Sequence, residues 1–333
     1  MPDNIKLLDC TLRDGMYITD FHTDDAVKRP VIKALETAGI DIIECGFLKR
    51  GKSEANSAVY GSLDELKPFI ECKKPNVMYA AIVMEIDNAP DFPVRTSNGL
   101  DCIRIAFFKN DADAAIELAK RVKEKGYDVL VQPMRTSDYS DTEIRELIGK
   151  INTIKPFGMA VVDSNGNMLP NELTNLANIY RECLEPSICA GFHFHNNSQL
   201  AFANAISAID IMQGRELVID CSIFGMGRGA GNLPTELIAG YLNKGGADYD
   251  VNAVFDTYDK YFAETFKITP WGYSLKHLLS ANYNANPYFA TFMSDKYNLN
   301  TNELSRAFAS MTVTERMSFN PAVAEKAARS VKQ

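Results

Sequence analysis

The chain has 333 residues, of which 46% are hydrophobic and 23% charged, and its formal net charge is −8 at pH 7. This composition is typical of a globular protein, and the length allows one large barrel or two average domains. A net negative charge argues against nucleic acid or an anionic membrane as the main partner. No run approaches the ~20 apolar residues of a membrane-spanning helix, and no apolar signal segment opens the sequence. We therefore expect a cytoplasmic protein that acts on small molecules.

Strand-like and helix-like segments alternate through most of the chain. Apolar segments typical of strands lie at 5–9, 41–46, 77–84, 102–107, 129–134, 158–163, 188–195 and 217–223. Segments with the apolar spacing of amphipathic helices lie at 24–38, 62–69, 111–125, 141–155, 171–184, 199–212 and 234–242. Eight such strands, most of them followed by a helix, predict a parallel sheet closed into a (β/α)8 TIM barrel. An open, doubly wound α/β sheet is the alternative fold.

The remaining residues are rich in Tyr, Phe and Asn and have a mostly helical pattern. We therefore expect a TIM-barrel catalytic domain at 1–248 and a helical C-terminal extension at 249–333. The seven cysteines include no C-x-x-C pair, so the sequence indicates neither a zinc-thiolate site nor a redox motif. They are expected to be reduced, small residues of the core.

Two histidines one residue apart, in the segment 191–197 (GFHFHNN), follow a strand-like run. Side chains alternate faces along a strand, so His193 and His195 point the same way. Two imidazoles on one face of a strand end suit a divalent metal, although two hydrogen-bonded loop histidines give the same pattern. In a barrel of this kind the chemistry lies at the carboxyl ends of the strands. Polar residues follow several of the other expected strands, namely Asp9 and Asp14, Glu44, Gln132, Asp163 and Ser164. This repetition favours the metal site.

Three segments, in this order, carry a family resemblance: 8–15 (LDCTLRDG), the histidine pair, and 229–232 (GAGN). Together they resemble the DRE-TIM metallolyase superfamily, which includes 4-hydroxy-2-oxovalerate aldolase, HMG-CoA lyase, and the isopropylmalate and homocitrate synthases. The segments 11–16 (TLRDGM) and 225–227 (GMG) are most similar to the 4-hydroxy-2-oxovalerate aldolase type. The resemblance runs from about residue 5 to 242.

The resemblance implies that Asp14, His193 and His195 bind a divalent ion, Mn²⁺ or Mg²⁺, and that Asn232 is either a further ligand or a neighbour of the ligands. Mixed carboxylate and imidazole ligation suits such an ion. It further implies that Arg13 stabilises an enolate formed when a 4-hydroxy-2-oxo acid is split into a pyruvate-type enolate and an aldehyde. Glu44 is expected either to orient Arg13 or bind substrate, or to form a purely structural ion pair.

The sequence departs from the aldolase pattern directly after Gly15-Met16. The aldolases have a histidine there that helps to move the proton of the 4-hydroxyl group, and this chain has Tyr17. Tyr17 is a candidate proton-transfer group, although a phenol with a pKa near ~10 is a poor base. His22 is a possible substitute or an ordinary surface histidine. The segment 270–274 (PWGYS) resembles the family stretch that carries an active-site tyrosine, which makes Tyr273 a further catalytic candidate.

Two alternatives to the aldolase remain open from the sequence. One is a Claisen-type acyltransferase that condenses a 2-oxo acid with acetyl-CoA, which would release free CoA. The other is a non-catalytic metal-binding barrel, with Tyr17 as its sequence support. The aromatic C-terminal extension is expected to form a homo-oligomer interface, for example in a homodimer. The aldolase resemblance also raises an aldehyde dehydrogenase as a partner.

Overall fold

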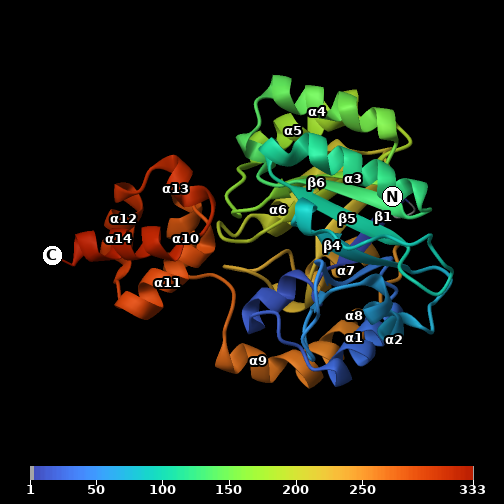
Figure 1. Ribbon diagram of the computed structural model, residues 1–333, viewed down its shortest axis with the longest axis horizontal. Helices are drawn as coiled ribbons and strands as arrows, with labels where there is room; N and C mark the ends of the chain where they lie inside the picture. The colour runs from blue at the N-terminus through green and yellow to red at the C-terminus, as the bar shows by residue number, and fades with distance from the viewer. Residues whose placement is uncertain (1–3, 333) are drawn as a thin grey trace.

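The computed structural model describes residues 4–332 and confirms the barrel (Figure 1). Its parallel strands are β1 (Ile5–Asp9), β2 (Ile42–Leu48), β4 (Met78–Val83), β5 (Cys102–Phe107), β6 (Asp128–Pro133), β7 (Gly158–Asp163), β8 (Cys189–Phe194) and β9 (Leu217–Cys221). The strand β1 pairs with both β9 and β2, which closes the sheet. The open-sheet alternative is therefore wrong. A short strand, β3 (Val59–Tyr60), adds to β2 outside the barrel.

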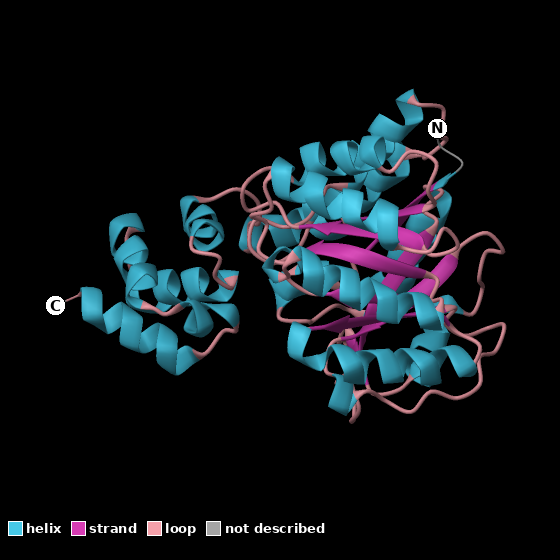
Figure 2. Cartoon of the chain, turned by 90° about the horizontal axis from the view of Figure 1, so that it is seen from above, coloured by secondary structure: helices cyan, strands magenta, loops and turns pink. Residues whose placement is uncertain are grey.

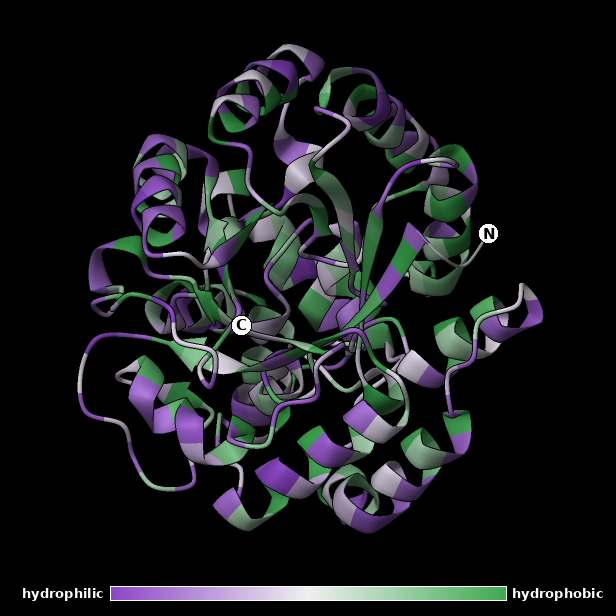
Figure 3. Ribbon diagram, turned by 90° about the vertical axis from the view of Figure 1, so that its right-hand side faces the viewer, coloured by the Kyte–Doolittle hydropathy of each residue, from purple (hydrophilic) through white to green (hydrophobic). Residues whose placement is uncertain are grey.

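Amphipathic helices surround the strands, as Figures 2 and 3 show. They are α1 (Asp25–Thr37), α2 (Lys67–Ile70), α3 (Ala112–Glu124), α4 (Asp141–Ile154), α5 (Pro170–Cys183), α6 (Ala201–Ile211) and α7 (Thr235–Lys244). Local sequence sets several helix starts: Ser140 and Glu143 form a capping box at the start of α4, and the Asp24 side chain caps α1. The expected helix at 62–69 is a 3₁₀ turn (Leu63–Leu66) followed by the single turn α2.

Along each strand, apolar side chains point alternately into the barrel interior and toward the layer under the helices. The apolar side chains that fill the interior belong to Leu8, Cys10, Ile42, Ala80, Cys102, Leu130, Ala160, Val162, Cys189 and Val218. All seven cysteines lie within the described residues and none of them forms a disulfide; five are buried, as expected of core residues, whereas Cys183 is half-buried and Cys72 is exposed. None of the helices in residues 4–332 combines the length and the apolar character needed to cross a membrane.

The helical C-terminal extension consists of two parts. The first part is α8 (Val251–Thr257), a π-helical segment (Tyr258–Phe262) and α9 (Ala263–Ile268), and its Val254 and Phe262 belong to the barrel core. The second part is α10 (Leu275–Asn282), α11 (Pro287–Tyr297), α12 (Thr301–Ser310), α13 (Val313–Met317) and α14 (Pro321–Val331). This C-terminal bundle lies beside the barrel (Figure 1) and has its own apolar core around Phe289 and Phe308.

Asn284 makes several of the hydrogen bonds that join the C-terminal bundle to the barrel. Asn284, whose φ of 49° is left-handed, follows α10. Its Oδ1 accepts hydrogen bonds from the side chains of Asn165 (2.8 Å) and Asn167 (3.1 Å), and its Nδ2 donates to Asp138 (3.2 Å). These partners follow β6 and β7, so the bundle meets the carboxyl ends of the strands.

The two apolar cores predict separable stabilities. Replacing the buried Phe289 with alanine leaves a cavity in the bundle, and such changes cost about 3–5 kcal/mol. We therefore expect Phe289→Ala to increase amide hydrogen exchange in α10–α14 but not in the barrel strands, as measured by mass spectrometry. The control Val313→Ala, at a position 67% exposed, should change neither. Equal loss of protection in the barrel strands would show instead that the two cores unfold together.

Candidate metal centre

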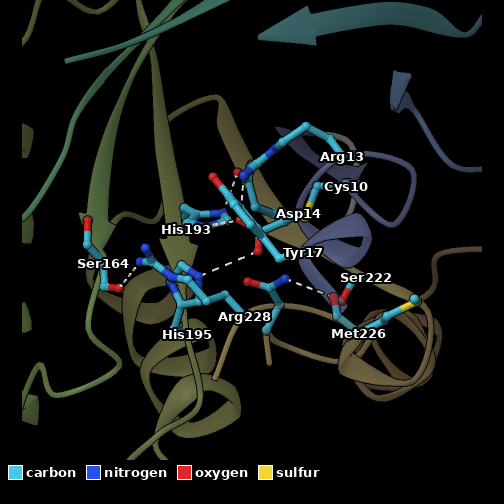
Figure 4. Close-up of polar contacts among 12 residues, drawn as sticks. Cys10, Arg13, Asp14, Tyr17, Ser164, His193, His195, Ser222, Met226 and Arg228 are labelled. Carbon is cyan, nitrogen blue, oxygen red and sulfur yellow. Dashed lines mark hydrogen bonds and ion pairs between the residues drawn. The ribbon is translucent and has the colours of Figure 1, made fainter. Parts of the chain in front are cut away.

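The structure brings together the three predicted metal ligands, although Asp14 lies near the start of the barrel sequence and the two histidines lie near its end. Asp14 opens the 3₁₀ turn after β1, His193 lies in β8, and His195 directly follows that strand. The Nε2 atom of His193 is 3.5 Å from Oδ2 of Asp14, and Nε2 of His195 is 3.6 Å from Oδ1 (Figure 4). All three side chains are buried, and one ligand atom from each lies within 4.8 Å of the others.

Each imidazole is oriented by a hydrogen bond at its other nitrogen. Nδ1 of His193 lies 2.8 Å from a carboxylate oxygen of Asp220, and Nδ1 of His195 lies 3.0 Å from the backbone oxygen of Asp163. Because these oxygens accept, Nδ1 of each ring carries the proton. The lone pair of each Nε2 therefore faces Asp14, which is the usual arrangement of histidines that bind metal.

Several buried acceptor atoms, at two of the three predicted metal ligands and at the neighbouring Asn232, have no hydrogen-bond partner within residues 4–332. They are Oδ1 of Asp14, Nε2 of His195 and Oδ1 of Asn232, whose Nδ2 donates to the backbone oxygen of Met226. A Cβ atom on Gly227 would lie 3.1 Å from Oδ1 of Asp14 and 2.2 Å from Nδ2 of Asn232, so Asn232 lies next to Asp14. Unpaired buried acceptors are costly. A divalent cation held by Asp14, His193 and His195 would satisfy the unpaired atoms of Asp14 and His195 at once, so the residues present fit the predicted metal.

The electrostatics of Asp14 and His195 favour the protonation states that bind a cation, whereas those of His193 favour the protonated ring. Burial disfavours the charged form of Asp14, but Arg13 and the two imidazoles outweigh it and hold the pKa of this carboxyl well below its usual value. Burial lowers the pKa of His195 despite the nearby Asp14. Burial also opposes charge on His193, but hydrogen bonds to Asp14 and Asp220 outweigh it and raise the pKa of this imidazole. A cation would displace the proton that these carboxylates attract.

A chain of buried charges connects Arg13 to His193 across the barrel. One carboxylate oxygen of Glu44 accepts from Nε of Arg13 (2.7 Å) and from Nη1 of Arg104 (2.7 Å). Arg104 also pairs with Asp220, and Arg13 pairs with Asp14. Of the roles expected for Glu44, this geometry matches the orientation of Arg13. Sequence analysis missed Arg104 and Asp220, although a charged residue inside an apolar strand was the available signal.

A cavity of about 390 Å³ opens beside the metal ligands. Its polar wall is formed by Arg13, Asp14, Gln132, Arg135, Ser164, Asn165, His193, His195 and Arg228. Its apolar wall is formed by Tyr17, Phe21, Phe47, Leu48, Val59, Ile82, Met84, Ala106, Phe108, Met134 and Val162. Lys49, Glu85 and, from the C-terminal bundle, Asn286 and Met317 complete the lining. The cavity therefore has the size and mixed lining of a small-molecule site.

The remaining predicted residues fall in different places. The ring of Tyr17 packs edge-on against Phe21 and Phe47, and its hydroxyl lies 3.5 Å from the sulfur of Met84. Burial raises the pKa of this phenol. Tyr273 is 55% exposed and lies between α9 and α10. It is not among the described residues that line the cavity. His22 is also exposed. The structure thus brings Tyr17 into the site but neither Tyr273 nor His22.

The HMGL-like family model matches residues 4–259. The chain therefore belongs to the HMGL-like family, which confirms the metallolyase resemblance and the prediction of a lyase-family enzyme. A 4-hydroxy-2-oxovalerate aldolase of Pelotomaculum thermopropionicum is 30% identical over 74% of this chain and 73% of its own length. An oxaloacetate decarboxylase of Mycobacterium tuberculosis is 28% identical over 75% of this chain and 74% of its own length.

Solved structures agree on the fold. The N-terminal domain of a candidate aldolase from Bacteroides vulgatus superimposes with a TM-score of 0.73 at 31% identity, over 88% of this chain and 98% of that one. The HMG-CoA lyase of Brucella melitensis superimposes with a TM-score of 0.60 at 15% identity, over 76% and 96% of the two chains, and supports the barrel fold alone.

The position of Gly227 predicts a test of the metal centre. Because a Cβ atom there would overlap the Asn232 amide, Gly227→Ala should displace Asn232 and weaken Mn²⁺ binding by about 10- to 100-fold, as is typical when the groups around metal ligands are disturbed. Isothermal titration calorimetry with MnCl₂ measures this.

Gly240→Ala is the matched control. This glycine lies in α7 and no described atom lies within 4 Å of the added Cβ, so metal affinity should be unchanged while unfolding becomes up to ~1 kcal/mol more costly. Unchanged Mn²⁺ affinity in Gly227→Ala would exclude Asn232 from the metal site.

Proposed function

We propose that this chain is a divalent-metal-dependent aldolase that breaks or forms the C3–C4 bond of a 4-hydroxy-2-oxo acid. One observation carries the proposal: one ligand atom from each of Asp14, His193 and His195 lies within 4.8 Å of the others at the wall of the cavity, with Arg13 beside them. The name of the Pelotomaculum relative supports the substrate class. The products of cleavage would be pyruvate, or a related 2-oxo acid, and an aldehyde.

The metal held by Asp14, His193 and His195 and the guanidinium of Arg13 would both stabilise the enolate. Asp14, His193 and His195, with Asn232 beside them, would hold Mn²⁺ or Mg²⁺, which supplies positive charge at an enolate oxygen. Cleavage leaves the electron pair of the C3–C4 bond on C3, delocalised onto the 2-oxo oxygen. The guanidinium of Arg13 is fixed by Glu44 and Asp14 before substrate arrives, so it can donate to this oxygen without reorganisation.

Proton transfer is the step that the family resemblance leaves open, because Tyr17 stands where the aldolase pattern has a histidine. Cleavage of a 4-hydroxy-2-oxo acid removes the 4-hydroxyl proton, whereas condensation returns a proton to that oxygen. The phenol of Tyr17 lines the cavity and burial raises its pKa, so it is protonated at neutral pH and suited to donate in the direction of condensation.

The same observation favours a second candidate, the decarboxylation of a 2-oxo diacid. Loss of carbon dioxide from C4 of oxaloacetate also breaks a C3–C4 bond and leaves the same enolate, but no hydroxyl proton has to be removed. A site without the histidine of the aldolases therefore suits this reaction. The relative from Mycobacterium tuberculosis, named an oxaloacetate decarboxylase, supports it.

Asp14→Asn tests the shared mechanism. Removing the carboxylate takes away one ligand and the partner of Arg13, so release of pyruvate from 4-hydroxy-2-oxo acids should fall at least about 100-fold, as when an electrostatic stabiliser of a transition state is lost. Chelation of metal from the native protein should have the same effect, reversed by Mn²⁺. The exposed His22→Ala is the control and should retain full activity. Full activity of Asp14→Asn after chelation would refute the proposal.

Tyr17→Phe separates the two candidate reactions. If the phenol moves the 4-hydroxyl proton, the ratio of aldol cleavage to oxaloacetate decarboxylation should fall by about 100-fold or more, since general acid–base groups contribute factors of that order. Pyruvate release from the two substrates, measured side by side, gives the ratio. An unchanged ratio would show that Tyr17 only packs against Phe21 and Phe47.

A further inference from the structure

Two hydrogen-bond donors on the cavity wall are buried and have no role in the metal centre. Gln132 lies in β6, Arg135 is the second residue after the end of that strand, and these residues are only 2% and 5% exposed. Both line the cavity. Within residues 4–332, Nε2 of Gln132 and Nη1 of Arg135 have no hydrogen-bond partner. Since leaving a buried charged donor unpaired is costly, these atoms point to an acceptor that enters the cavity.

Arg135 is held in a fixed position before any ligand arrives. Its φ of 55° is left-handed, which is unfavourable for arginine and turns the chain sharply at the end of β6. Its backbone N–H donates to the hydroxyl of Ser164 (2.9 Å), its Nε donates to Asp138 (2.5 Å), and its Nη2 donates to the backbone oxygen of Asn284 (3.5 Å). Nη1 is thus the corner of the guanidinium left for a ligand.

A second arginine of the cavity lining, Arg228, also has a buried nitrogen without a partner in the described chain, its Nε, which is available to the carboxylate of the 2-oxo acid itself. Arg228 donates to the backbone oxygen of Ser164 (2.8 Å), and its charge contributes to lowering the pKa of His195, after the larger effect of burial. Arg228 lines the same cavity as His193 and His195. The other cations of the lining have carboxylate partners in the same cavity: Arg13 pairs with Asp14, and Lys49 pairs with Glu85 (2.6 Å). Arg135 pairs through Nε with Asp138, which is not part of the lining, and differs from Arg13 and Lys49 in its Nη1, which is buried without a partner in the described chain.

We propose that Arg135 and Gln132 form a subsite for a second carboxylate, carried by the aldehyde or by the outer end of a 2-oxo diacid. The inference rests on the proposed 2-oxo acid chemistry and names the class of its second substrate. In condensation, C3 of pyruvate loses a proton, the C3–C4 bond forms to the aldehyde carbon, and the aldehyde oxygen gains a proton. Throughout this step the remote carboxylate would accept from Nη1 of Arg135 and Nε2 of Gln132.

Matched aldehydes test the subsite in the Mn²⁺-loaded protein. Succinic semialdehyde and butanal have the same chain length and differ by the carboxylate, and glycolaldehyde phosphate tests a phosphate in its place. We expect kcat/KM for condensation with pyruvate to favour succinic semialdehyde over butanal by about 10- to 100-fold, the value of one charge-assisted hydrogen bond. Arg135→Gln should reduce this ratio by a similar factor, mainly through KM for the aldehyde.

Arg145→Gln makes the same change of charge on the surface, where Arg145 pairs with Glu182, and should leave the ratio unaltered. If Arg135→Gln does not fold, the preference of the native protein and the ratio in Arg135→Lys still decide. A native preference for butanal or for the phosphate, or equal loss with both four-carbon aldehydes in Arg135→Gln, would overturn the inference.

Exchange of the pyruvate methyl protons with deuterium, followed by NMR without any aldehyde, reports enolate formation alone. If exchange occurs and the carboxylate preference does not, the subsite is wrong and the proposed function stands. If no exchange occurs, the proposed function fails and the inference fails with it.

Discussion

The pairing of buried charges across the barrel is the constraint on which the site depends. Arg104 is fully buried in β5, and its guanidinium is compensated by Glu44 of β2 and Asp220 of β9. Removing one partner of such a pair leaves an uncompensated charge in a poorly polarisable interior and is strongly destabilising. The two carboxylates that neutralise Arg104 are also those that orient Arg13 and His193. Stability of the barrel and alignment of the site therefore depend on the same contacts.

The small side chains of the barrel interior make this pairing possible. Ala80, Cys102 and Ala160 fill the interior only partly, because none extends far from its strand. A long arginine can then reach neighbours on two strands that are not adjacent to its own. The closed sheet is also required, since β9 pairs with β1 only in a barrel. An open sheet would leave Asp220 too far from Arg104, with the charge unpaired.

Sequence patterns predicted what depends on local periodicity. The apolar strand runs and the spacing of His193 and His195 repeat within a few residues, so the barrel and two residues of the candidate metal site could be inferred directly. Arg104 and Asp220 could not be paired in advance, because they are 116 residues apart and their contact depends on strand register across the barrel. The position of Tyr273 outside the cavity could not be predicted for a related reason: it depends on how the chain passes from α9 to the C-terminal bundle. No local sequence pattern indicates that the first part of the extension packs on the barrel core and that the second part forms a core of its own.

The C-terminal bundle belongs to the chemistry as well as to the architecture. Asn284 contacts the loops after β6 and β7, and these are the loops that place Arg135 and Asn165 on the cavity wall. Asn286 and Met317 then close part of the same cavity. An enolate in an open barrel mouth would be protonated by water before it met an aldehyde, so enclosure favours carbon–carbon bond formation over loss of the intermediate. The backbone oxygen of Asn284 thus contributes to the position of the Arg135 guanidinium, and the bundle covers part of the cavity in which the proposed reaction would take place.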